Sequence, residues 1–400
     1  MPGTRLIEGR DIKRMCELKG SDETLRHLSE ALDKALVKPD DFSIRDLAEA
    51  FMGVEWLNNL RHKSGRNYHS RELSEAAAVS YADFSNITGQ IIFSKINEGY
   101  ADQDFVFQKE VPVIPSDIQD MEKIPGMGNI GDEGQYVMEG NEYPMVAFPE
   151  DWQEVAAKRK RGMIVPVTRE AILGDKTGLI LTRARKIGYG EGLFLEKRII
   201  DAIIDENAGA VSAALGGHRY HWKGTTYASF QSSTPWANIQ TSNALIDWTD
   251  MDNARQKLLA ITDPYTGEPI MINARDIIVT PQNEFRALRI LSATSTTTHA
   301  GGYAATGNLE EHDAPSPLAG KGYRVLTSQM LANRAATDTD WWYGSVKDQL
   351  ARFVNWDMET EEAAADHPDR FKKDIQMQIR VSLKDAVSVL EPRAMVENQA

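Results

Sequence analysis

The chain has a single cysteine, Cys16, among its 400 residues. An intrachain disulfide needs two cysteines and a thiolate metal cluster needs several, so both are excluded. Long apolar runs are also missing. Stretches such as IIVT at 277–280 fall far short of the roughly twenty residues of a membrane helix, and the N-terminal MPGTRLIEGRDIKRM lacks a signal-peptide core. We therefore expect a cytosolic protein that contacts no membrane and is stabilised by packing and assembly.

Catalytic signatures are equally scarce, since GxSxG, HExxH and Walker patterns do not occur. Gly126, Gly128 and Gly131 spell GxGxxG, but MEKIP before the motif is no buried strand and the acidic DEGQYVMEG after it repels phosphate. A turn at the base of a hairpin is the better interpretation. His218 and His221 form an HxxH pair without cysteine partners, which indicates ordinary loop histidines more than a metal site. We predict no enzyme, no cofactor and no metal.

The net charge of −14 is unevenly distributed. Residues 98–157 contain fourteen acidic side chains against Lys109 and Lys123, a balance of −12, whereas residues 158–198 carry eleven Lys and Arg against four Asp and Glu, a balance of +7. Two solvated faces explain this pattern, and so does an acidic block that lies over the basic block of a neighbouring subunit. The negative net charge of the whole chain argues against a protein that binds nucleic acid.

Helical patterns dominate the first hundred residues, at 22–37, 44–57, 72–82 and 86–96. An extended texture begins at Phe105, and turn residues predict a long hairpin over 132–161. Its apolar side chains, such as Tyr143, Met145 and Phe148, cannot be buried by an isolated hairpin, so they need a neighbouring subunit unless the hairpin folds back on its own domain.

The segment 158–206 reads as a strand, a polar corner at 173–178 and then a helix of about thirty residues at 177–206. This helix contains Gly188, Gly190 and Gly192, and each glycine inside a helix costs about 1 kcal/mol relative to alanine. The glycines serve either helix bending or close packing against a neighbouring element. Further along, the pattern predicts helices at 251–261 and 283–291 and strands at 276–281 and 323–328.

Three blocks carry a family resemblance: GMIVPVTREAI leading into the glycine-bearing helix with Glu196 and Lys197, then DIIVTPQNEFRALRIL, and finally FKKDIQMQIRVSLKDAVSVLEPRAMV. In this order they resemble the major capsid proteins of tailed bacteriophages with the Hong Kong 97-type fold, over about residues 105–400. The resemblance implies an α+β protein with an N-terminal helical arm, an extended E-loop, a peripheral domain with a long spine helix, and an axial domain.

The resemblance also implies domain boundaries. Residues 1–104 would be the N-terminal arm or a scaffolding-like segment, 132–161 the E-loop, and 225–325 the axial domain. The peripheral domain would take 105–131 and 162–224, including the spine helix, together with the strands of 326–384, and residues 385–400 would return to the axial domain.

The implied function is a structural one. Hexamers and pentamers of the chain would form the icosahedral head that encloses double-stranded DNA of a tailed phage or prophage, without sequence-specific binding of the DNA. An encapsulin-like cargo compartment is the alternative. Partners would be other copies of the chain, a portal, and in some relatives a maturation protease or decoration proteins. The protein would assemble in the bacterial host cytoplasm and end in the virion capsid.

Some relatives link subunits by an isopeptide bond from an E-loop lysine, but no lysine occurs from Ile124 to Ala157, so we predict a shell without that link. Contacts between subunits would then be noncovalent, through apolar burial and charge pairing between the acidic hairpin and the basic tetrad 158–161. The candidate contact residues are Glu139, Glu142, Tyr143, Met145, Phe148, Glu150, Asp151, Trp152, Lys158, Arg159, Lys160 and Arg161.

Overall fold

The computed structural model describes residues 14–15, 18, 21–33, 47, 88–102, 104–118, 120–128, 136–143, 150–168, 179–205, 220–233, 235–299, 311–318, 320–335, 337–363 and 375–400. The chain divides into two compact units. Unit 1 comprises Met1–Asp104, Lys160–Phe194 and Asp357–Leu383, and unit 2 comprises Phe105–Arg159, Leu195–Trp356 and Lys384–Ala400. Helix α6 (Leu179–Ile204) and strands β13 (Leu350–Glu362) and β14 (Ile375–Val389) contribute residues to both.

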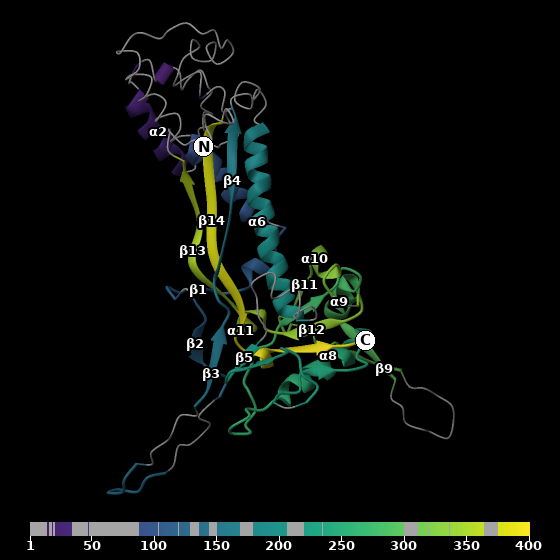
Figure 1. Cartoon of the computed structure of the whole chain (residues 1–400). Helices are drawn as coiled ribbons and strands as arrows, with labels where there is room; N and C mark the ends of the chain where they lie inside the picture. Colours follow the sequence, from purple (N-terminus) through teal and green to yellow (C-terminus); the bar gives the residue numbers. More distant parts are fainter. Residues whose placement is uncertain are drawn as a thin grey trace, which may run out of the picture. The chain divides into compact units, whose positions relative to one another are not determined.

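Helices and strands are mixed along the described chain, which confirms the predicted α+β class (Figure 1). Residues 88–100 are helical, and the remaining helices are α2 (Ser21–Asp33), η2 (Phe107–Lys109), α8 (Trp248–Leu259), α9 (Glu284–Ser292), α10 (Gln329–Ala332), α11 (Val346–Gln349) and η4 (Pro392–Ala394). The first strands are β1 (Val113–Pro115), β2 (Glu122–Pro125), β3 (Trp152–Val155), β4 (Arg159–Thr168), β5 (Tyr220–Trp222), β6 (Thr225–Tyr227) and β7 (Ile239–Gln240). The later strands are β8 (Asp276–Val279), β9 (Ser295–His299), β10 (Glu311–Pro315), β11 (Arg324–Leu326), β12 (Trp341–Gly344) and β15 (Met395–Asn398).

In unit 1, the helix at 88–100 crosses the first half of α6 at very close range. A Cβ atom built on Gly99 would lie 2.1 Å from the carbonyl oxygen of Arg185, and one built on Gly188 would lie 1.9 Å from the carbonyl oxygen of Ile96. Two glycines therefore let the two backbones touch. Ile92 and Ile96 are fully buried, so this part of the expected N-terminal arm belongs to the core of unit 1.

Unit 2 contains a five-stranded sheet in the order β11-β8-β12-β15-β7. Strand β8 is parallel to β11 and antiparallel to β12, and β15 pairs with β12 and with β7. All four residues of β8 are buried, as are those of β12, which explains the continuous apolar runs IIV and WWY.

One predicted boundary runs through this sheet. Strand β12, together with Leu326 of β11, lies in the same sheet as β8, whereas the resemblance implied that residues 326–384 are strands of the peripheral domain. The strands pair across a long separation in sequence, and residue patterns carry no information on that pairing. Strand β15, which falls in the predicted C-terminal return, also lies in this sheet.

The predicted helices and strands around this sheet are confirmed, with ends shifted by a few residues: α8, β8, α9 and β11 occupy the expected positions. Helix α8 starts where Asp247 accepts a hydrogen bond from the backbone N–H of Thr249 while Asp250 reaches back to the backbone of Asp247, a capping box.

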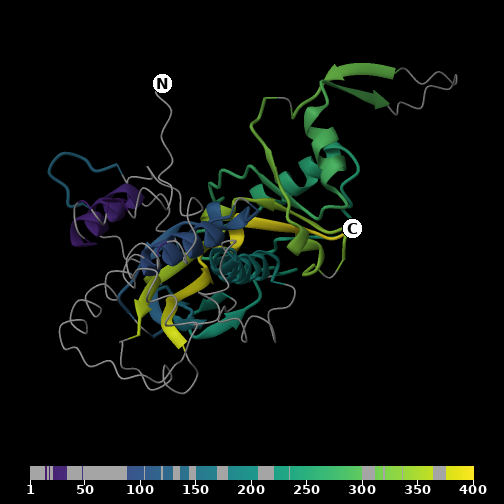
Figure 2. The same ribbon diagram turned by 90° about the horizontal axis from the view of Figure 1, so that it is seen from above.

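Three further sheets complete the described strands, in the orders β1-β13-β14-β4, β2-β3-β5-β6 and β10-β9. Strands β9 and β10 form a two-stranded ribbon that extends beyond α9, as both views show (Figure 2). Strand β4 belongs to the sheet with β14, while β3 belongs to the sheet with β2. Strands β3 and β4, which are close in sequence, therefore belong to different sheets.

Candidate functional site

The hairpin is built on strands β2 and β3, which pair antiparallel from Glu122 opposite Val155 to Pro125 opposite Trp152. The sequence analysis placed the hairpin at 132–161. In the structure Gly126 and Gly128 already follow the paired strand β2, and Arg159–Arg161 lie in β4. Sequence patterns located the turn residues correctly but could not show which strand pairs with which.

Asp151 holds the base of this hairpin together. Its carboxylate accepts a hydrogen bond from the backbone N–H of Gly128 at 2.5 Å and another from the indole N–H of Trp222 on β5. A Cβ atom on Gly126 would collide with the same carboxylate. Gly126 and Gly128 thus serve the hairpin base, as predicted, while Gly131 lies outside the described residues. Asp151 was a candidate for contacts between subunits, and its carboxylate already has partners within its own chain.

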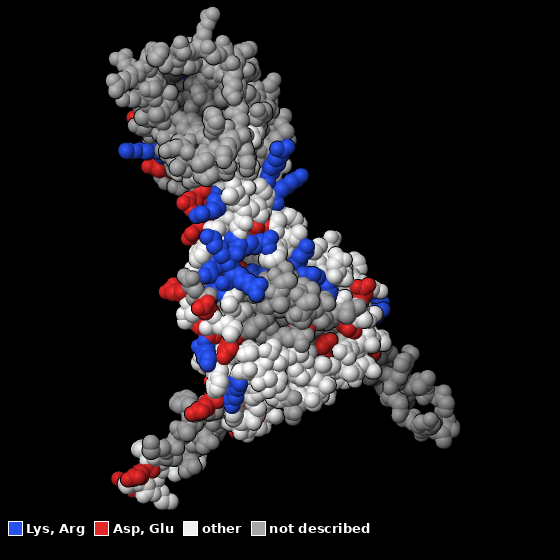
Figure 3. All heavy atoms as spheres, in the orientation of Figure 1, with Lys and Arg blue, Asp and Glu red and all other residues white. Residues whose placement is uncertain are grey.

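The described end of the hairpin, residues 136–143, is a tight turn. The backbone N–H of Asn141 donates to the carbonyl oxygen of Met138 at 3.0 Å, and Gly140 has a φ of 87°, which glycine adopts without strain. Tyr136 and Tyr143 are fully exposed or nearly so, at 109% and 83%. Glu139 and Glu142 are exposed as well, and Figure 3 shows acidic side chains gathered at the end of the hairpin.

The other hairpin candidates differ in their surroundings. Met145 and Phe148 lie outside the described residues. Glu150 is exposed and Trp152 is half-buried, with the ammonium of Lys123 5.3 Å from the centre of its ring. Trp152 therefore packs partly within its own chain.

The four residues of the basic tetrad 158–161 differ in burial and do not form one surface. The side chain of Lys158 is fully buried, and its ammonium donates to the carbonyl oxygen of Ile118 at 2.7 Å and lies 3.2 Å from Glu122. A hydrogen bond from Ser116 and the nearby Lys158 hold the pKa of Glu122 below its usual value, against the effect of burial. Lys158 thus stabilises the base of the hairpin, and its buried side chain is not accessible to a neighbouring subunit.

Arg161 on β4 is also engaged inside the chain. Its guanidinium stacks 3.3 Å from the centre of the Phe194 ring, and its Nε lies 2.7 Å from the carboxylate of Glu191, which is almost completely buried. Arg159 and Lys160 are exposed. Of the four predicted basic residues, these two remain candidates for contacts with another subunit.

The three glycines of α6 fall into different environments. Gly188 sits at the helix crossing described above, which favours the packing interpretation for that position. A Cβ on Gly190 would meet nothing within 4 Å, so packing does not explain this glycine and the bending hypothesis remains for it. Gly192 is buried.

Sequence reasoning missed the role of the charged residues in the second half of α6 and of Asp205, which directly follows the helix. Glu196 is 1% exposed and accepts hydrogen bonds from the backbone N–H groups of Val106, Phe107 and Gln108 at 3.0–3.1 Å. Burial raises the pKa of Glu196, and the three hydrogen bonds partly oppose that effect. The side chain thereby fixes the segment that leads toward the hairpin onto α6.

The same stretch of α6 holds three more segments of unit 2. Arg198 pairs with Asp385 on β14 at 2.6 Å, Asp201 pairs with Arg334 at 2.6 Å, and Asp205 accepts from the backbone N–H of Ser229 at 2.6 Å. The segment LFLEKRIIDAIIDE is apolar around most of the helix, which indicates that it is buried. Charged side chains in a buried helix need partners, so this pattern was a sequence signal for the ion pairs and hydrogen bonds of these residues.

Asp385 has a second cationic partner, because Nε of Arg352 lies 2.8 Å from its other oxygen. All three side chains are less than one-tenth exposed. Burial raises the pKa of Asp385, but the two guanidinium groups outweigh it and hold the pKa below its usual value. The triad joins α6, β13 and β14 within unit 2.

The described residues offer no metal site of three or more His, Cys, Asp or Glu side chains. His221 lies 3.0 Å from Glu154 and within hydrogen-bond distance of the Thr226 hydroxyl, while His218 lies outside the described residues. Within the described part of the chain, helices are too short or too polar to cross a bilayer.

A family model described as phage capsid protein matches residues 152–398. This match begins at β3 and ends in β15, so it covers more than half of the chain. The chain belongs to this phage capsid family. Membership makes it a shell-forming capsid protein that associates with copies of itself and has its place in the virion capsid.

Solved capsid structures are similar at low identity. The capsid of the cyanophage P-SCSP1u matches with 14% identity over 74% of this chain and 88% of that chain, at a TM-score of 0.44. The capsid of the native GTA particle matches with 10% identity over 75% and 92%, at 0.44, and the virus-like particle from Pyrococcus furiosus with 12% over 77% and 98%, at 0.41. No curated protein matches the chain. These TM-scores add nothing to the family assignment.

Proposed function

We propose that this capsid protein builds the icosahedral head of a tailed phage or prophage, as hexamers and pentamers that enclose packaged double-stranded DNA. In this proposal the layout is of the Hong Kong 97 type. Helix α6 is the spine, the hairpin on β2 and β3 is the E-loop, and the five-stranded sheet with α8 and α9 is the axial domain. The role is structural rather than enzymatic.

The observation that carries the proposal is the exposed turn at 136–143. Tyr136, Met138 and Tyr143 expose 109%, 79% and 83% of their surfaces on a hairpin that is held firmly at its base. Large apolar side chains that remain in water favour association, because burial contributes about 25 cal/mol for each Å² removed from water. A neighbouring copy that covers this turn gains that free energy without any change in its own fold.

Charge complementarity supports the same contact. Glu139 and Glu142 flank the exposed apolar side chains, and Arg159 and Lys160 are exposed on the edge of the basic block. We propose that the acidic turn of one subunit faces these two basic residues of its neighbour. Lys158 is excluded from this contact because its side chain is fully buried, and Arg161 is less exposed than Arg159 and Lys160 because it packs on Phe194.

We further propose that the shell carries no isopeptide link from the hairpin, because no lysine occurs from Ile124 to Ala157. Subunit ladders on a denaturing gel would contradict this. Assembly in the host cytoplasm, a portal, and a maturation protease or decoration proteins complete the proposal. The helix at 88–100 is locked to α6 through Gly99 and Gly188, so any removal of an N-terminal segment should leave this helix in place, which mass spectrometry of shells can check.

Electron microscopy of the purified protein tests the proposal. Icosahedral shells that contain DNA are expected. Shells filled with protein would instead indicate an encapsulin-like compartment, and discrete low-order oligomers would contradict a shell protein.

The proposed charge contact has its own test. The double substitution Arg159→Glu and Lys160→Glu should abolish shells while circular dichroism shows a folded subunit, and adding Glu139→Lys and Glu142→Lys should restore assembly. Lys347→Glu, at an exposed lysine of α11, is the matched control and should assemble normally. Normal shells from the Arg159 and Lys160 variant would refute the contact.

A further inference from the structure

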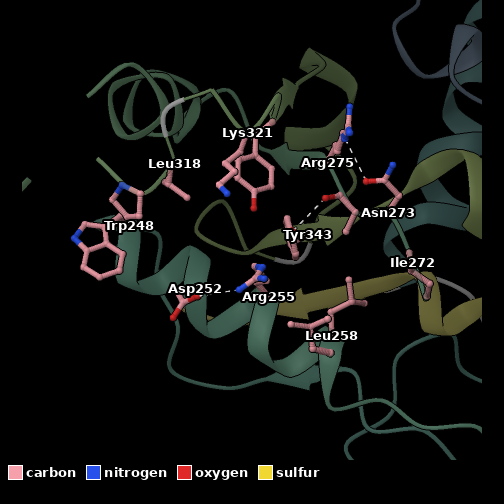
Figure 4. Close-up of a pocket in the computed structure, with 14 residues that line it drawn as sticks. Trp248, Asp252, Arg255, Leu258, Ile272, Asn273, Arg275, Leu318, Lys321 and Tyr343 are labelled. Atoms are coloured by element: carbon pink, nitrogen blue, oxygen red, sulfur yellow. Dashed lines mark hydrogen bonds and ion pairs between the residues drawn. The ribbon is translucent and has the colours of Figure 1, made fainter. Parts of the chain in front are cut away.

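Unit 2 contains a cavity of about 520 Å³ between α8, the segment that precedes β8, the loop before β11, and strand β12 (Figure 4). Ligand sites in proteins commonly have volumes of about 300–1,000 Å³. None of the contacts proposed above uses this cavity. Its chemistry is therefore considered separately.

One wall comes from a single face of α8. Trp248, Asp252, Arg255 and Leu259 are spaced four, three and four residues apart, so they form one stripe along the helix. The adjoining side of the helix, with Met251 and Ala254, is buried. The helix is thus anchored by its apolar face and presents Arg255 to the cavity.

Lys321 reaches the cavity from the opposite side, at the end of a loop shaped by two glycines. Gly320 and Gly322 have φ angles of 73° and 74°, a backbone conformation that favours glycine. The backbone N–H of Lys321 donates to the carbonyl oxygen of Leu318 at 3.2 Å, which closes the turn. Figure 4 shows Lys321 and Arg255 reaching into the same hollow from different elements.

A third cation, Arg275, is held in place by the sheet. Its backbone N–H donates to Gly344 at 3.0 Å, its carbonyl oxygen accepts from Arg324 at 2.9 Å, and its side-chain Nε donates to Asn273 at 3.2 Å. The floor is aromatic. Tyr343 is 3% exposed, its hydroxyl donates to the carbonyl oxygen of Ala274, and the ring of Tyr323 lies edge-on at 6.1 Å.

The charges of the lining do not cancel. Asp252 is the single acid among the lining residues and lies 3.7 Å from Arg255, which leaves Arg275 and Lys321 without a carboxylate in the cavity. Cations gathered around a hollow repel one another, and a bound anion relieves that repulsion. Arginine forks and a lysine ammonium suit phosphate oxygens, while the partly exposed Trp248 and Tyr323 suit a flat organic body.

We propose that this cavity binds a small organic phosphate of the nucleoside phosphate class. Arg255, Arg275 and Lys321 would hold the phosphate, and the aromatic residues would contact the base. The ligand would bridge α8, the 318–322 loop and the segment before β8, and so would stabilise unit 2.

Isothermal titration calorimetry of the purified full-length protein with dAMP, deoxyribose 5-phosphate and inorganic phosphate tests this proposal. We expect saturable binding of dAMP that is at least about tenfold tighter than that of the other two probes. The variant with Arg255→Ala and Lys321→Ala should lose at least about tenfold in affinity for dAMP, which corresponds to about 1.4 kcal/mol, with an unchanged circular dichroism spectrum. Lys257→Ala, on α8 but outside the cavity, is the control and should bind as the unsubstituted protein does.

Two results would overturn the proposal: no saturable dAMP binding, or equal dAMP affinity in the double variant and the control. Inorganic phosphate binding as tightly as dAMP would overturn the assignment of an organic ligand. All three results are independent of whether the protein forms shells, so the proposed function stands or falls separately.

Discussion

The second half of α6 with the residue that follows it, 195–205, and the hairpin turn at 136–143 both combine acidic with apolar side chains, yet they use them in opposite ways. In the first region the carboxylates of Glu196, Asp201 and Asp205 are buried and each accepts hydrogen bonds from another segment of unit 2. In the turn, Glu139 and Glu142 are exposed together with two tyrosines. One region completes the fold of a single chain, and the other leaves apolar and charged groups for another molecule.

From this comparison we expect that removing a buried charged group beside α6 lowers the free energy of unfolding more than any of the other substitutions we propose. Asp385→Ala leaves Arg198 and Arg352 buried without their shared carboxylate, so the free energy of unfolding should fall by about 3–5 kcal/mol. Urea denaturation followed by tryptophan fluorescence at matched protein concentration measures the change. Glu361→Ala breaks the exposed pair with Arg380 and serves as the control; it should cost at most about 1 kcal/mol. Similar losses in the two variants would contradict the assigned role of the triad.

Two glycines in the first half of α6 should respond with opposite signs. Gly188→Ala places a Cβ against the carbonyl oxygen of Ile96, and the forced backbone shift should destabilise the protein by about 1–3 kcal/mol. Gly190→Ala meets open space, so it should stabilise the helix by about 0.5–1 kcal/mol. Thermal denaturation of both variants measures the difference. If Gly190 eases helix bending, its alanine variant should also slow any change of shell size.

The buried acids of α6 predict a pH dependence. Burial raises the pKa of Asp201 to about 6, against the opposing effect of Arg334. Because the folded pKa exceeds that of the unfolded chain, the folded state binds more protons between about pH 4 and 6, and the contribution of Asp201 to stability falls as pH rises through that window. Asp201→Asn should flatten the stability profile there. An unchanged slope would show that Asp201 does not titrate as stated.

The hairpin turn should show the smallest effect on folding and a large one on assembly. Tyr136 and Tyr143 expose 109% and 83% of their surfaces, so replacing both by serine should change the free energy of unfolding of the subunit by no more than about 0.5 kcal/mol. Shell yield, measured by light scattering, should fall sharply. Phe285→Ser, at an 80% exposed residue of α9, is a control for the loss of exposed apolar surface. Normal shells from the tyrosine variant would contradict the proposed role of the turn in assembly.

Much of the local structure was predictable because it depends on neighbours in sequence. The long helix, helix α8 and the buried strand DIIV follow from periodicity and turn residues, whereas the α+β class was implied by the family resemblance. The ends of the hairpin were not predictable. The strand that pairs with β3 is β2, and the choice between β2 and β4 depends on packing that residue patterns do not encode.

The candidate site shows the same division residue by residue. The sequence showed that the hairpin is acidic and apolar and that a basic cluster follows it. It could not show that Lys158 is buried against Ile118 and Glu122, or that Arg161 lies on Phe194, because those partners are distant in sequence.

The sequence by itself determined several of the helices and strands, among them α6, α8, β8 and α9, together with the separation of acidic from basic blocks, the lack of a lysine in the hairpin and the resemblance to phage capsid proteins. Only the tertiary structure decided which charged side chains are buried and which are exposed. It also decided that Gly188 packs against the helix at 88–100 while Gly190 faces open space. The physical reason is that burial and ion pairing depend on distances between groups far apart in sequence, whereas helix periods, turns and net charge are local or additive properties.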